Sequence, residues 1–434
     1  MNFILAIPVE LRLAILCVVG AAAGSLVNLA VYRLAWHPRS ISPWSAPLPK
    51  APRRAWSDRI PIFGWIGLRR ESRLHGGQVW LRPMIVEICG AILFPALYRW
   101  EVLEQGLLPG FANPQFQAAP IPAMLTPNIM LALHAEVAVH FVLICLMAVA
   151  SLIDVDEMII PDSVTVPGTL IGLVVAAVYP SSLLPDVLWN LPALSPQLSF
   201  LTLVAPNNWP AVLGGAPQTH SLAIALGCWW LWCFALMPRR WRARRGQLRA
   251  ASLFLSRLVR ELVTWQLVGL GVIGSLAISL VWWRGNAASW AALLTALVGL
   301  AVGGGIVWSV RIIGTTALRR EAMGFGDVTL MAMIGAFLGW QICLVIFFLA
   351  PFAGLVVGLV QWLFRGHREI PYGPFLCLAA LTALWFWASI WNNIFGVFGI
   401  PWLVPAVISL CMVLLGLLLV VWRLILSLFK RPAE

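Results

Sequence analysis

Long apolar runs separated by short polar segments dominate this chain of 434 residues. Most of these runs have about the 17–25 residues that an α-helix needs to cross the hydrocarbon core of a bilayer. The run at 350–364 is short, and its length also fits a re-entrant segment. We therefore predict an all-α, polytopic integral membrane protein with about 11 transmembrane helices, within a range of about 8–12. The predicted spans are near 11–34, 83–99, 131–153, 163–180, 220–237, 264–283, 288–310, 328–349, 350–364, 375–393 and 402–424.

Composition supports a membrane protein and changes how the charge is interpreted. The chain is 61% hydrophobic and 11% charged, whereas soluble domains are about 25% charged. Its net charge is +12, but the basic residues lie between the apolar runs. No basic helix or aromatic platform accompanies them, so we expect the lipid bilayer as a partner and no nucleic acid.

Loop charges predict the orientation of the spans. Ten Lys and Arg residues lie in 33–82 and eight in 239–260, whereas the loops near 101–130, 181–219 and 394–401 have none. Basic loops face the cytoplasm, so the N-terminus is expected outside and the C-terminus in the cytoplasm. Leu11–Gly20 and the small residues Ala21–Gly24 that follow resemble a signal peptide with its cleavage site, but the preceding flank is not basic and the apolar run continues to Leu34. We interpret residues 11–34 as a retained first transmembrane helix.

Two short acidic motifs adjoin apolar runs in a chain with only 17 Asp and Glu residues. One is the stretch from Asp154 to Asp162, and the other is Gly324-Phe325-Gly326-Asp327. A carboxylate beside hydrocarbon is costly and is therefore a functional candidate. The topology above places Asp154 and Asp327 at the same cytoplasmic depth, which suggests an intramembrane aspartyl protease.

A carboxyl pair at one membrane face can hydrolyse a peptide bond. One group must be ionised to take a proton from water, and the other must be protonated to donate to the scissile carbonyl. Two carboxyl groups held close together share a proton and titrate as a pair. The glycines of the second motif would let backbone or substrate approach closely and would permit a positive φ.

Structural interpretations compete for the neighbouring polar residues. Asp162 follows Pro161 and is well placed to be a helix N-cap. Asp156 and Glu157 fit either a supporting role in the motif or a solvated loop. Four more polar residues lie inside apolar spans and are interpreted as interhelical hydrogen bonders, namely Glu87, His134, Glu136 and His140.

The chain resembles the type IV prepilin peptidases, a family of aspartyl proteases of the bacterial inner membrane. The resemblance rests on five ordered matches along the chain. They are Gly24–Leu34, the segment from Arg59-Ile60-Pro61 through Trp65 to Arg82-Pro83 and Glu87, Leu152-Ile153-Asp154 with Pro161-Asp162, Met323–Val328 with Gly335–Trp340, and Ile370-Pro371-Tyr372-Gly373-Pro374-Phe375.

The resemblance implies a function and a set of site residues. The implied activity is an aspartic endopeptidase that cleaves prepilin or pseudopilin leaders at the cytoplasmic face, in pilus or type II secretion assembly. The implied substrates have a basic leader followed by an apolar helix. The implied catalytic pair is Asp154 and Asp327. The supporting motif residues are Asp156, Pro161, Asp162, Gly324, Gly326, Pro371, Gly373 and Pro374.

The chain departs from this family in its first cytoplasmic loop. Many members have two C-x-x-C pairs there, a zinc-binding arrangement, but residues 35–82 contain no cysteine. Ser72 and His75 stand where the second pair would fall. We therefore expect no metal and no cofactor, zinc included. N-methylation of the new amino terminus is doubtful, and S-adenosylmethionine would be needed only if that activity is retained.

The expected organisation is a peptidase core interrupted by an insertion. The insertion contains an outer loop, a basic cytoplasmic loop and two extra helices. The expected segments are the first helix at 1–34, the basic loop at 35–82, peptidase core at 83–180, the insertion at 181–310, further core at 311–393, and an additional C-terminal helix and tail at 394–434.

Two other classes of function remain open on the sequence. A proton-coupled transporter could use the same two aspartates as a relay, and it would have further charges deep in its spans. A catalytically inactive homologue could serve as a membrane scaffold, and loss of either aspartate would indicate it. Both aspartates are present.

Overall fold

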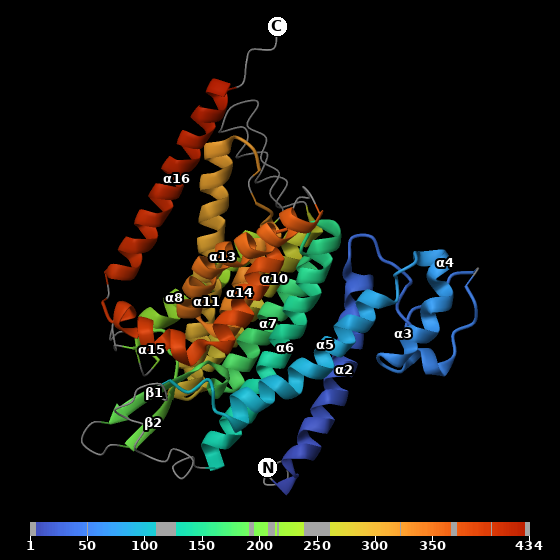
Figure 1. Ribbon diagram of the computed structural model, residues 1–434. Coiled ribbons are helices and arrows are strands. Elements are labelled where there is room, and N and C mark those ends of the chain that lie inside the picture. The colour runs from blue at the N-terminus through green and yellow to red at the C-terminus, as the bar shows by residue number, and fades with distance from the viewer. Residues whose placement is uncertain are drawn as a thin grey trace.

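A computed structural model describes the helical body of the chain (Figure 1). The basic loop predicted at 239–260 and much of the outer loop at 101–130 lie outside the described residues. The described residues are 6–49, 51–109, 127–190, 195–206, 213–214, 217–237, 261–321, 323–365, 371–400 and 402–429.

The body of the molecule is a bundle of long apolar helices, as the hydrophobic pattern predicts. In the described ranges, seven helices are long and apolar enough to cross a membrane, and one bent pair raises this number to as many as eight. Shorter apolar helices fill the remaining predicted spans. The elements are α2 (Val9–Leu34), α5 (Leu81–Tyr98), α6 (Pro127–Glu157), α7 (Asp162–Val178), α8 (Thr219–Leu236), α10 (Leu262–Arg284), α11 (Ala287–Leu318), α12 (Phe325–Leu338), α13 (Trp340–Arg365), α14 (Gly373–Trp385), α15 (Trp387–Phe398) and α16 (Leu403–Phe429).

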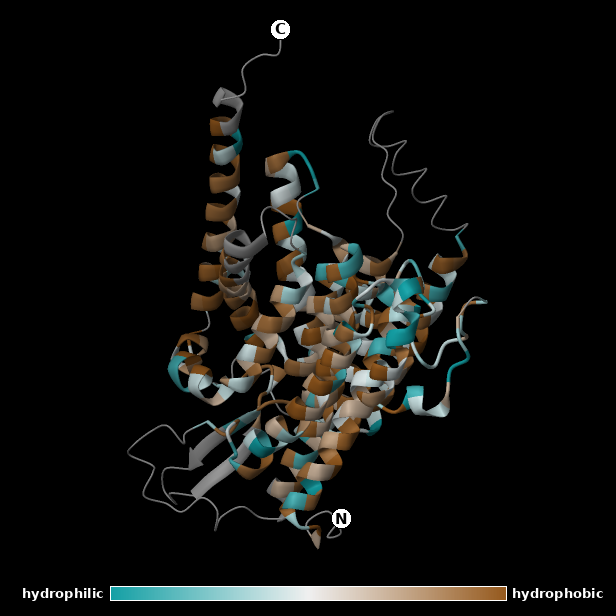
Figure 2. Ribbon diagram, turned by 45° about the vertical axis from the view of Figure 1, so that its right-hand side comes forward, coloured by the Kyte–Doolittle hydropathy of each residue, from teal (hydrophilic) through white to brown (hydrophobic). Residues whose placement is uncertain are grey.

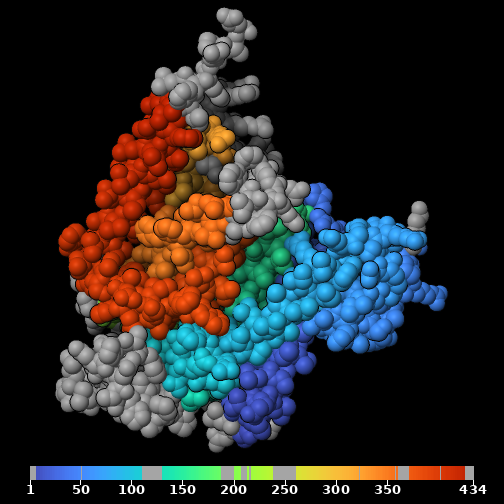
Figure 3. Space-filling model, viewed as in Figure 1, coloured from blue at the N-terminus to red at the C-terminus, as the bar shows by residue number. Residues whose placement is uncertain are grey.

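Short elements occupy the segments between the long helices. The segment between α2 and α5 projects to one side of the helical body (Figure 3). These elements are η1 (Trp56–Arg59), α3 (Phe63–Leu68), η2 (Arg69–Glu71), α4 (Ser72–His75), a π-helical turn η3 (Arg99–Leu103), η5 (Pro180–Ser182), and the strands β1 (Pro185–Asn190) and β2 (Ser195–Phe200).

The outer surface of the bundle is apolar, as a lipid-facing surface must be. Figure 2 shows hydrophobic residues along the length of the long helices. Side chains such as Leu276 and Leu418 are 67% and 66% exposed. In α16, none of the residues in its most apolar stretch is buried within the molecule. Exposed leucine on this scale is stable in hydrocarbon and would be an aggregation hazard in water.

The predicted break near residue 350 is wrong. The chain breaks at Gly339, whose φ of 87° ends α12, and α13 then continues through Pro351 to Arg365. A left-handed conformation is open to glycine, whereas proline inside a membrane helix can be accommodated by its neighbours. The segment 350–364 is therefore the second part of α13 and not a separate re-entrant element.

Two further features differ from the expected pattern. The predicted span at 375–393 is two helices, α14 and α15, which meet at an angle of 90°. The outer loop predicted at 181–219 contains an antiparallel hairpin of β1 and β2, in which Pro185 pairs with Phe200. This hairpin packs at the end of the bundle opposite the carboxyl end of α6 (Figure 1).

Close helix packing places α12 at the centre of the bundle. Every residue of α12 from Asp327 to Leu338 is buried. Gly299 of α11 faces Gly335 of α12, and a Cβ atom on either glycine would collide with the carbonyl oxygen of the other. Small residues at such a contact let two helix backbones approach closely, which is how membrane helices gain packing energy. The second acidic motif therefore begins a helix that the rest of the bundle holds in place.

Candidate active site

The first acidic motif begins in the last turn of α6. Asp154 lies in the last turn of α6 and is 5% exposed. Its carbonyl accepts a hydrogen bond from the N–H of Met158 at 2.9 Å, and Met158 has a φ of 56°. A non-glycine residue in this left-handed conformation costs free energy, so the surrounding structure must enforce the turn. The chain then reverses through Ile159–Pro161 and enters α7.

The second acidic motif packs directly against this turn. Asp327 lies in the first turn of α12 and is 7% exposed. A Cβ on Gly326 would lie 2.7 Å from Cβ of Ile160, so only glycine allows this approach. Neither glycine of this motif adopts the positive φ that the sequence permits. Gly324 has a φ of −65°, and Gly326 is not among the described residues with a positive φ.

A third segment, Pro371–Pro374, meets both motifs at the start of α14. The N–H of Gly373 donates a hydrogen bond to Oδ2 of Asp154 at 3.1 Å. A Cβ on Gly373 would lie 2.6 Å from that same oxygen. Pro374 occupies the first turn of α14, where its missing N–H is no loss. Tyr372 lies beside Asp327, and burial together with that carboxylate raises the pKa of Tyr372 to about 12.

The three segments surround one cavity of about 860 Å³. Asp154 and Asp327 both line it, although α6 and α12 are far apart in the sequence. Among the described residues that line it, none is a lysine or arginine. The lining residues are Asp154, Met158, Ile159, Ile160, Asp162, Glu321, Met323, Gly324, Phe325, Gly326, Asp327, Pro371 and Tyr372.

The cavity includes residues that the sequence motifs did not single out as site residues. Tyr372 stood inside a matched motif, but nothing in its spacing indicated a side chain directed at the cavity. Glu321 lies outside every motif, and it forms an ion pair with Arg311 at 2.6 Å. The Gly373 amide could not be identified from the sequence, because a main-chain donor has no signature of its own.

The N-cap interpretation of Asp162 is wrong. Pro161 is the N-cap of α7, and no side chain makes a capping hydrogen bond there. Asp162 is the first residue of the helix, is exposed, and lines the cavity. An acidic residue in the first turn still interacts favourably with the helix dipole. Its carboxylate is therefore part of the cavity surface.

Asp156 and Glu157 are not solvated loop residues, and neither lines the cavity. Both lie in the last turn of α6. Oδ1 of Asp156 accepts from Arg82 at 2.5 Å, and Glu157 accepts from the main-chain N–H of Trp36 at 2.7 Å and of His37 at 3.1 Å. These two acids therefore connect the end of α6 to the chain that follows α2 and to the start of α5.

Four polar residues in apolar spans are interpreted as hydrogen bonders between helices, and the structure confirms this for three of them, Glu87, His134 and His140. Glu87 accepts from Trp65 at 2.8 Å and from the N–H of Ile62 at 2.5 Å, as well as from Asn28 at 3.4 Å. His134 contacts the hydroxyl of Tyr98 at 3.0 Å, and His140 contacts Glu101 at 2.9 Å.

Glu136 differs from the other three. It is fully buried, and neither of its carboxyl oxygens has a hydrogen-bond partner among the described residues. His140 precedes Asp154 by 14 residues on the same helix. It therefore lies about 21 Å from Asp154 along the helix axis. Glu136 and His140 both lie in the first half of α6, and neither lines the cavity.

The loop between α2 and α5 does not fit a zinc site. The guanidinium of Arg54 donates to the carbonyl oxygens of Ser42 at 2.6 Å and Ser45 at 2.9 Å, and to both carboxyl oxygens of Glu71. Ser42 and Ser45 have the spacing of a C-x-x-C pair. A buried cation already joins the two limbs of this loop, and a second cation beside it would be repelled.

Metal-ligating side chains do not gather in this loop either. Among the described residues, no group of three or more His, Cys, Asp or Glu side chains is arranged to hold a metal ion. His75 lies 3.6 Å from Glu71, and the hydroxyl of Ser72 has no hydrogen-bond partner in the described part of the chain. Oxygen and one imidazole are poor substitutes for four thiolates.

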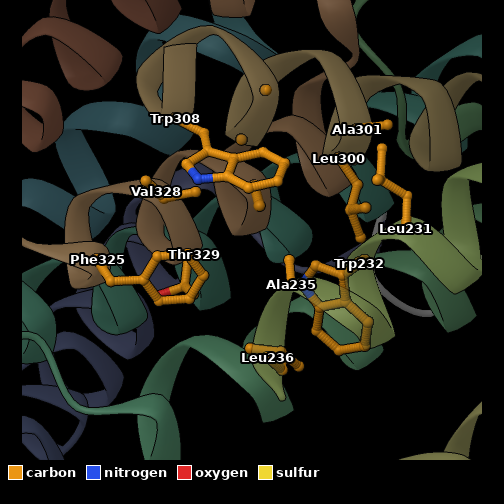
Figure 4. A pocket seen from close by; sticks show the side chains of 13 residues that line it. Leu231, Trp232, Ala235, Leu236, Leu300, Ala301, Trp308, Phe325, Val328 and Thr329 are labelled. Atoms are coloured by element: carbon orange, nitrogen blue, oxygen red, sulfur yellow. The ribbon is translucent and has the colours of Figure 1, made fainter. Parts of the chain in front are cut away.

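A second, small pocket lies beside the cavity and is lined mostly by apolar side chains (Figure 4). It has a volume of about 40 Å³ and lies between α8, α11 and α12. Phe325 lines both this pocket and the acidic cavity. Among the described residues that line it, none has an ionisable side chain.

Comparisons with known proteins match two segments of the chain. Residues 250–359 match the profile of the Type IV leader peptidase family, and residues 18–101 match that of the Bacterial Peptidase A24 N-terminal domain. The first match contains Asp327, and neither match contains Asp154. No solved structure matches the chain.

Relatives with similar sequences carry the name prepilin leader peptidase/N-methyltransferase. The relative from Aeromonas salmonicida (strain A449) is 35% identical over 92 residues, which is 20% of this chain and 32% of the relative. The relative from Aeromonas hydrophila is 32% identical over 141 residues, or 29% and 49%. That from Stutzerimonas stutzeri is 33% identical over 137 residues, or 28% and 47%. The chain thus matches half or less of each relative's length.

Proposed function

Because this chain belongs to the type IV leader peptidase family, we propose that it is a membrane-embedded aspartyl endopeptidase of the bacterial inner membrane. Its proposed substrates are prepilin-like or pseudopilin-like proteins with a basic leader and an apolar helix, as used in pilus or type II secretion assembly. The observation that carries this proposal is the shared cavity of Asp154 and Asp327.

The geometry supports cleavage at the membrane edge. The cavity lies where α6 ends and α12 begins. Figure 1 shows that α6 ends on the side of the bundle away from the N-terminus and from strands β1 and β2. An apolar substrate helix would remain among the transmembrane helices, and the peptide bond at its end would reach the two carboxyl groups. The acidic lining residues Asp154, Asp162, Glu321 and Asp327 are also favourable for a positively charged leader.

Mass spectrometry of a co-expressed pseudopilin tests this function. We expect cleavage before the apolar helix, and a new amino terminus that is largely unmethylated. The reason is the departure of residues 35–82 from the cysteine-containing loop, to which we link methylation. An intact leader in the presence of this enzyme would contradict the peptidase proposal, and a fully N-methylated terminus would contradict the methylation part alone.

We propose that the enzyme works without zinc, because Arg54 already joins the two limbs of its cytoplasmic loop. Purified protein should contain no stoichiometric zinc, and chelators should leave cleavage unchanged. Arg54→Ala should open the loop, since Arg54 and Glu71 are 7% and 3% exposed. Breaking such a buried pair costs about 3 kcal/mol.

Limited proteolysis measures whether the loop between α2 and α5 opens in Arg54→Ala. The protease should cut Arg54→Ala faster than wild type. Arg53→Ala is the matched control, because Arg53 is the adjacent residue and its side chain is exposed. Equal cutting of both variants, or one zinc ion per chain, would refute the role given to Arg54.

We also propose an N-terminus outside and a C-terminus in the cytoplasm. The support is the Lys and Arg imbalance between alternate loops. Reporter fusions after Arg54, Arg245 and Lys430 should report the cytoplasm, and fusions near Asn113 and Asn208 should report the outside. The last four of these positions lie outside the described residues. A cytoplasmic signal at Asn208 would contradict the shared face of the two aspartates.

A further inference from the structure

We infer that the main-chain N–H of Gly373 keeps the single negative charge of the aspartate pair on Asp154, so that Asp154 activates water and Asp327 donates the proton. This inference rests on the proposed function and assigns the roles within it. Gly373 is thereby a positioning residue, acting through Asp154. The sequence motifs treat the two aspartates alike, and only their surroundings distinguish them.

The donor that distinguishes the two aspartates is a main-chain N–H group that makes no hydrogen bond within its own helix. Gly373 is the first residue of α14, where a helix has no internal acceptor for the N–H group. This N–H donates to Oδ2 of Asp154 at 3.1 Å, and the hydrogen bond is buried. A hydrogen bond to the charged form of a carboxyl group favours that form, and the bond is stronger when the acceptor is ionised. The donor therefore stabilises a carboxylate at Asp154.

The space around Gly373 shows that the contact depends on glycine. A Cβ at this position would lie 2.6 Å from Oδ2 and 3.3 Å from Cγ of Asp154, and 2.8 Å from Cδ1 of Ile160. Any other residue would push the helix start away from the carboxylate or rotate the aspartate. The hydrogen bond between Gly373 and Asp154 therefore depends on the absence of a side chain at position 373.

Asp327 has no equivalent donor. Among the described residues, none donates a hydrogen bond to its carboxyl oxygens, and the nearby charge of Asp154 opposes its ionisation. The helix dipoles favour the opposite assignment. The carboxyl end of α6 opposes a negative charge on Asp154, and the amino end of α12 favours one on Asp327. A direct hydrogen bond to a carboxylate outweighs a dipole interaction.

Other titratable groups also face the pair. Asp162 and Glu321 line the same cavity, and Glu321 is offset by its ion pair with Arg311. Two neutral hydrogen-bond donors among the described residues also lie near the pair. They are the hydroxyl of Tyr372 and the thiol of Cys377, which donates to the carbonyl of Met147 at 3.5 Å.

The proton balance follows from this assignment. The Asp154 carboxylate takes a proton from water as the water oxygen bonds to the scissile carbonyl carbon, and Asp327 gives its proton to the carbonyl oxygen. The C–N bond then breaks as Asp154 returns its proton to the leaving nitrogen, while Asp327 takes one from the gem-diol. Both groups end in the state in which they began.

Chemical labelling of the wild-type protein tests the assignment without any substitution. A carboxylate opens an epoxide ring, so a phenoxymethyl epoxide should alkylate Asp154. A protonated carboxyl transfers its proton to a diazo carbon and is esterified with loss of N₂, so a diazoacetyl amide with Cu²⁺ should label Asp327. Peptide mapping reads both results, and the reverse pattern, or one residue taking both reagents, would overturn the inference.

Replacing the amide at position 373 by an ester tests the donor itself. Glycolic acid can be inserted there by suppressor tRNA during cell-free synthesis into nanodiscs, which removes only the N–H. We expect kcat to fall at least tenfold with KM within twofold, and the acidic limb of the kcat–pH profile to move to higher pH. The direction follows because Asp154 loses a contact that favours its ionised form.

A matched ester at Leu376 separates this effect from helix stability. The N–H of Leu376 donates within the same first turn to the carbonyl of Tyr372 at 3.2 Å. That ester should leave the acidic limb in place. An unmoved limb in the Gly373 ester, or the same shift in both esters, would refute the inference. Wild-type protein that fails to cleave would instead refute the proposed function.

Discussion

Asp154→Asn and Asp327→Asn are each expected to abolish leader cleavage while the protein remains inserted in the membrane. Both side chains are more than nine-tenths buried and line one cavity, so each amide replaces a carboxyl group without leaving space. Loss of a general acid or base lowers the rate by about 10²–10⁴-fold. Because the pair shares one proton, the double variant should be no slower than either single variant.

Asp156→Asn is the matched control for this experiment. It lies two residues from Asp154 on the same helix, but its carboxylate contacts Arg82 outside the cavity. Loss of such a partly exposed pair costs about 1 kcal/mol at most, so most of the activity should remain. Cleavage at a near wild-type rate in either catalytic variant would remove that aspartate from the mechanism.

Alanine at Gly326 or Gly373 should reduce kcat nearly as strongly, although neither residue offers a side chain. The added Cβ would lie 2.7 Å from Cβ of Ile160 in the first case and 2.6 Å from Asp154 in the second. Both contacts are too short for carbon, so the start of α12 or of α14 must shift. A displacement of about 1 Å at reacting groups can cost about 10²-fold in rate.

Gly227→Ala in α8 provides the control for these substitutions. A Cβ there would meet no atom within 4 Å, so activity and membrane content should match wild type. The test is a single-turnover cleavage rate for each variant at equal protein level. A Gly373→Ala variant that cleaves as fast as Gly227→Ala would show that α14 does not approach Asp154 as closely as described here.

Local physics explains why the sequence alone determined so much of this protein. The length of an apolar run and the charge of the loops on either side are properties of neighbouring residues, and they predicted the helical bundle. The shared depth of Asp154 and Asp327 followed from the same count. The glycines at 326 and 373 were also visible in the motifs, because a position without Cβ marks a close approach.

Only the tertiary structure decided what each polar side chain does. Asp156 and Asp162 belong to one short acidic stretch, yet one contacts Arg82 and the other lines the cavity. The direction of a side chain at a helix end depends on which other element packs there, and sequence spacing does not record this. The break at Gly339 likewise depends on a backbone conformation that an uninterrupted apolar run conceals.

The strongest example is the contact of Gly373 with Asp154, because its donor is a main-chain N–H that every residue except proline possesses. The hydrophobic pattern determined that α6, α12 and α14 are apolar helices. Their packing determined that the end of one and the starts of the other two meet around a single cavity. The sequence therefore specified the two carboxyl groups, and the fold made them different from each other.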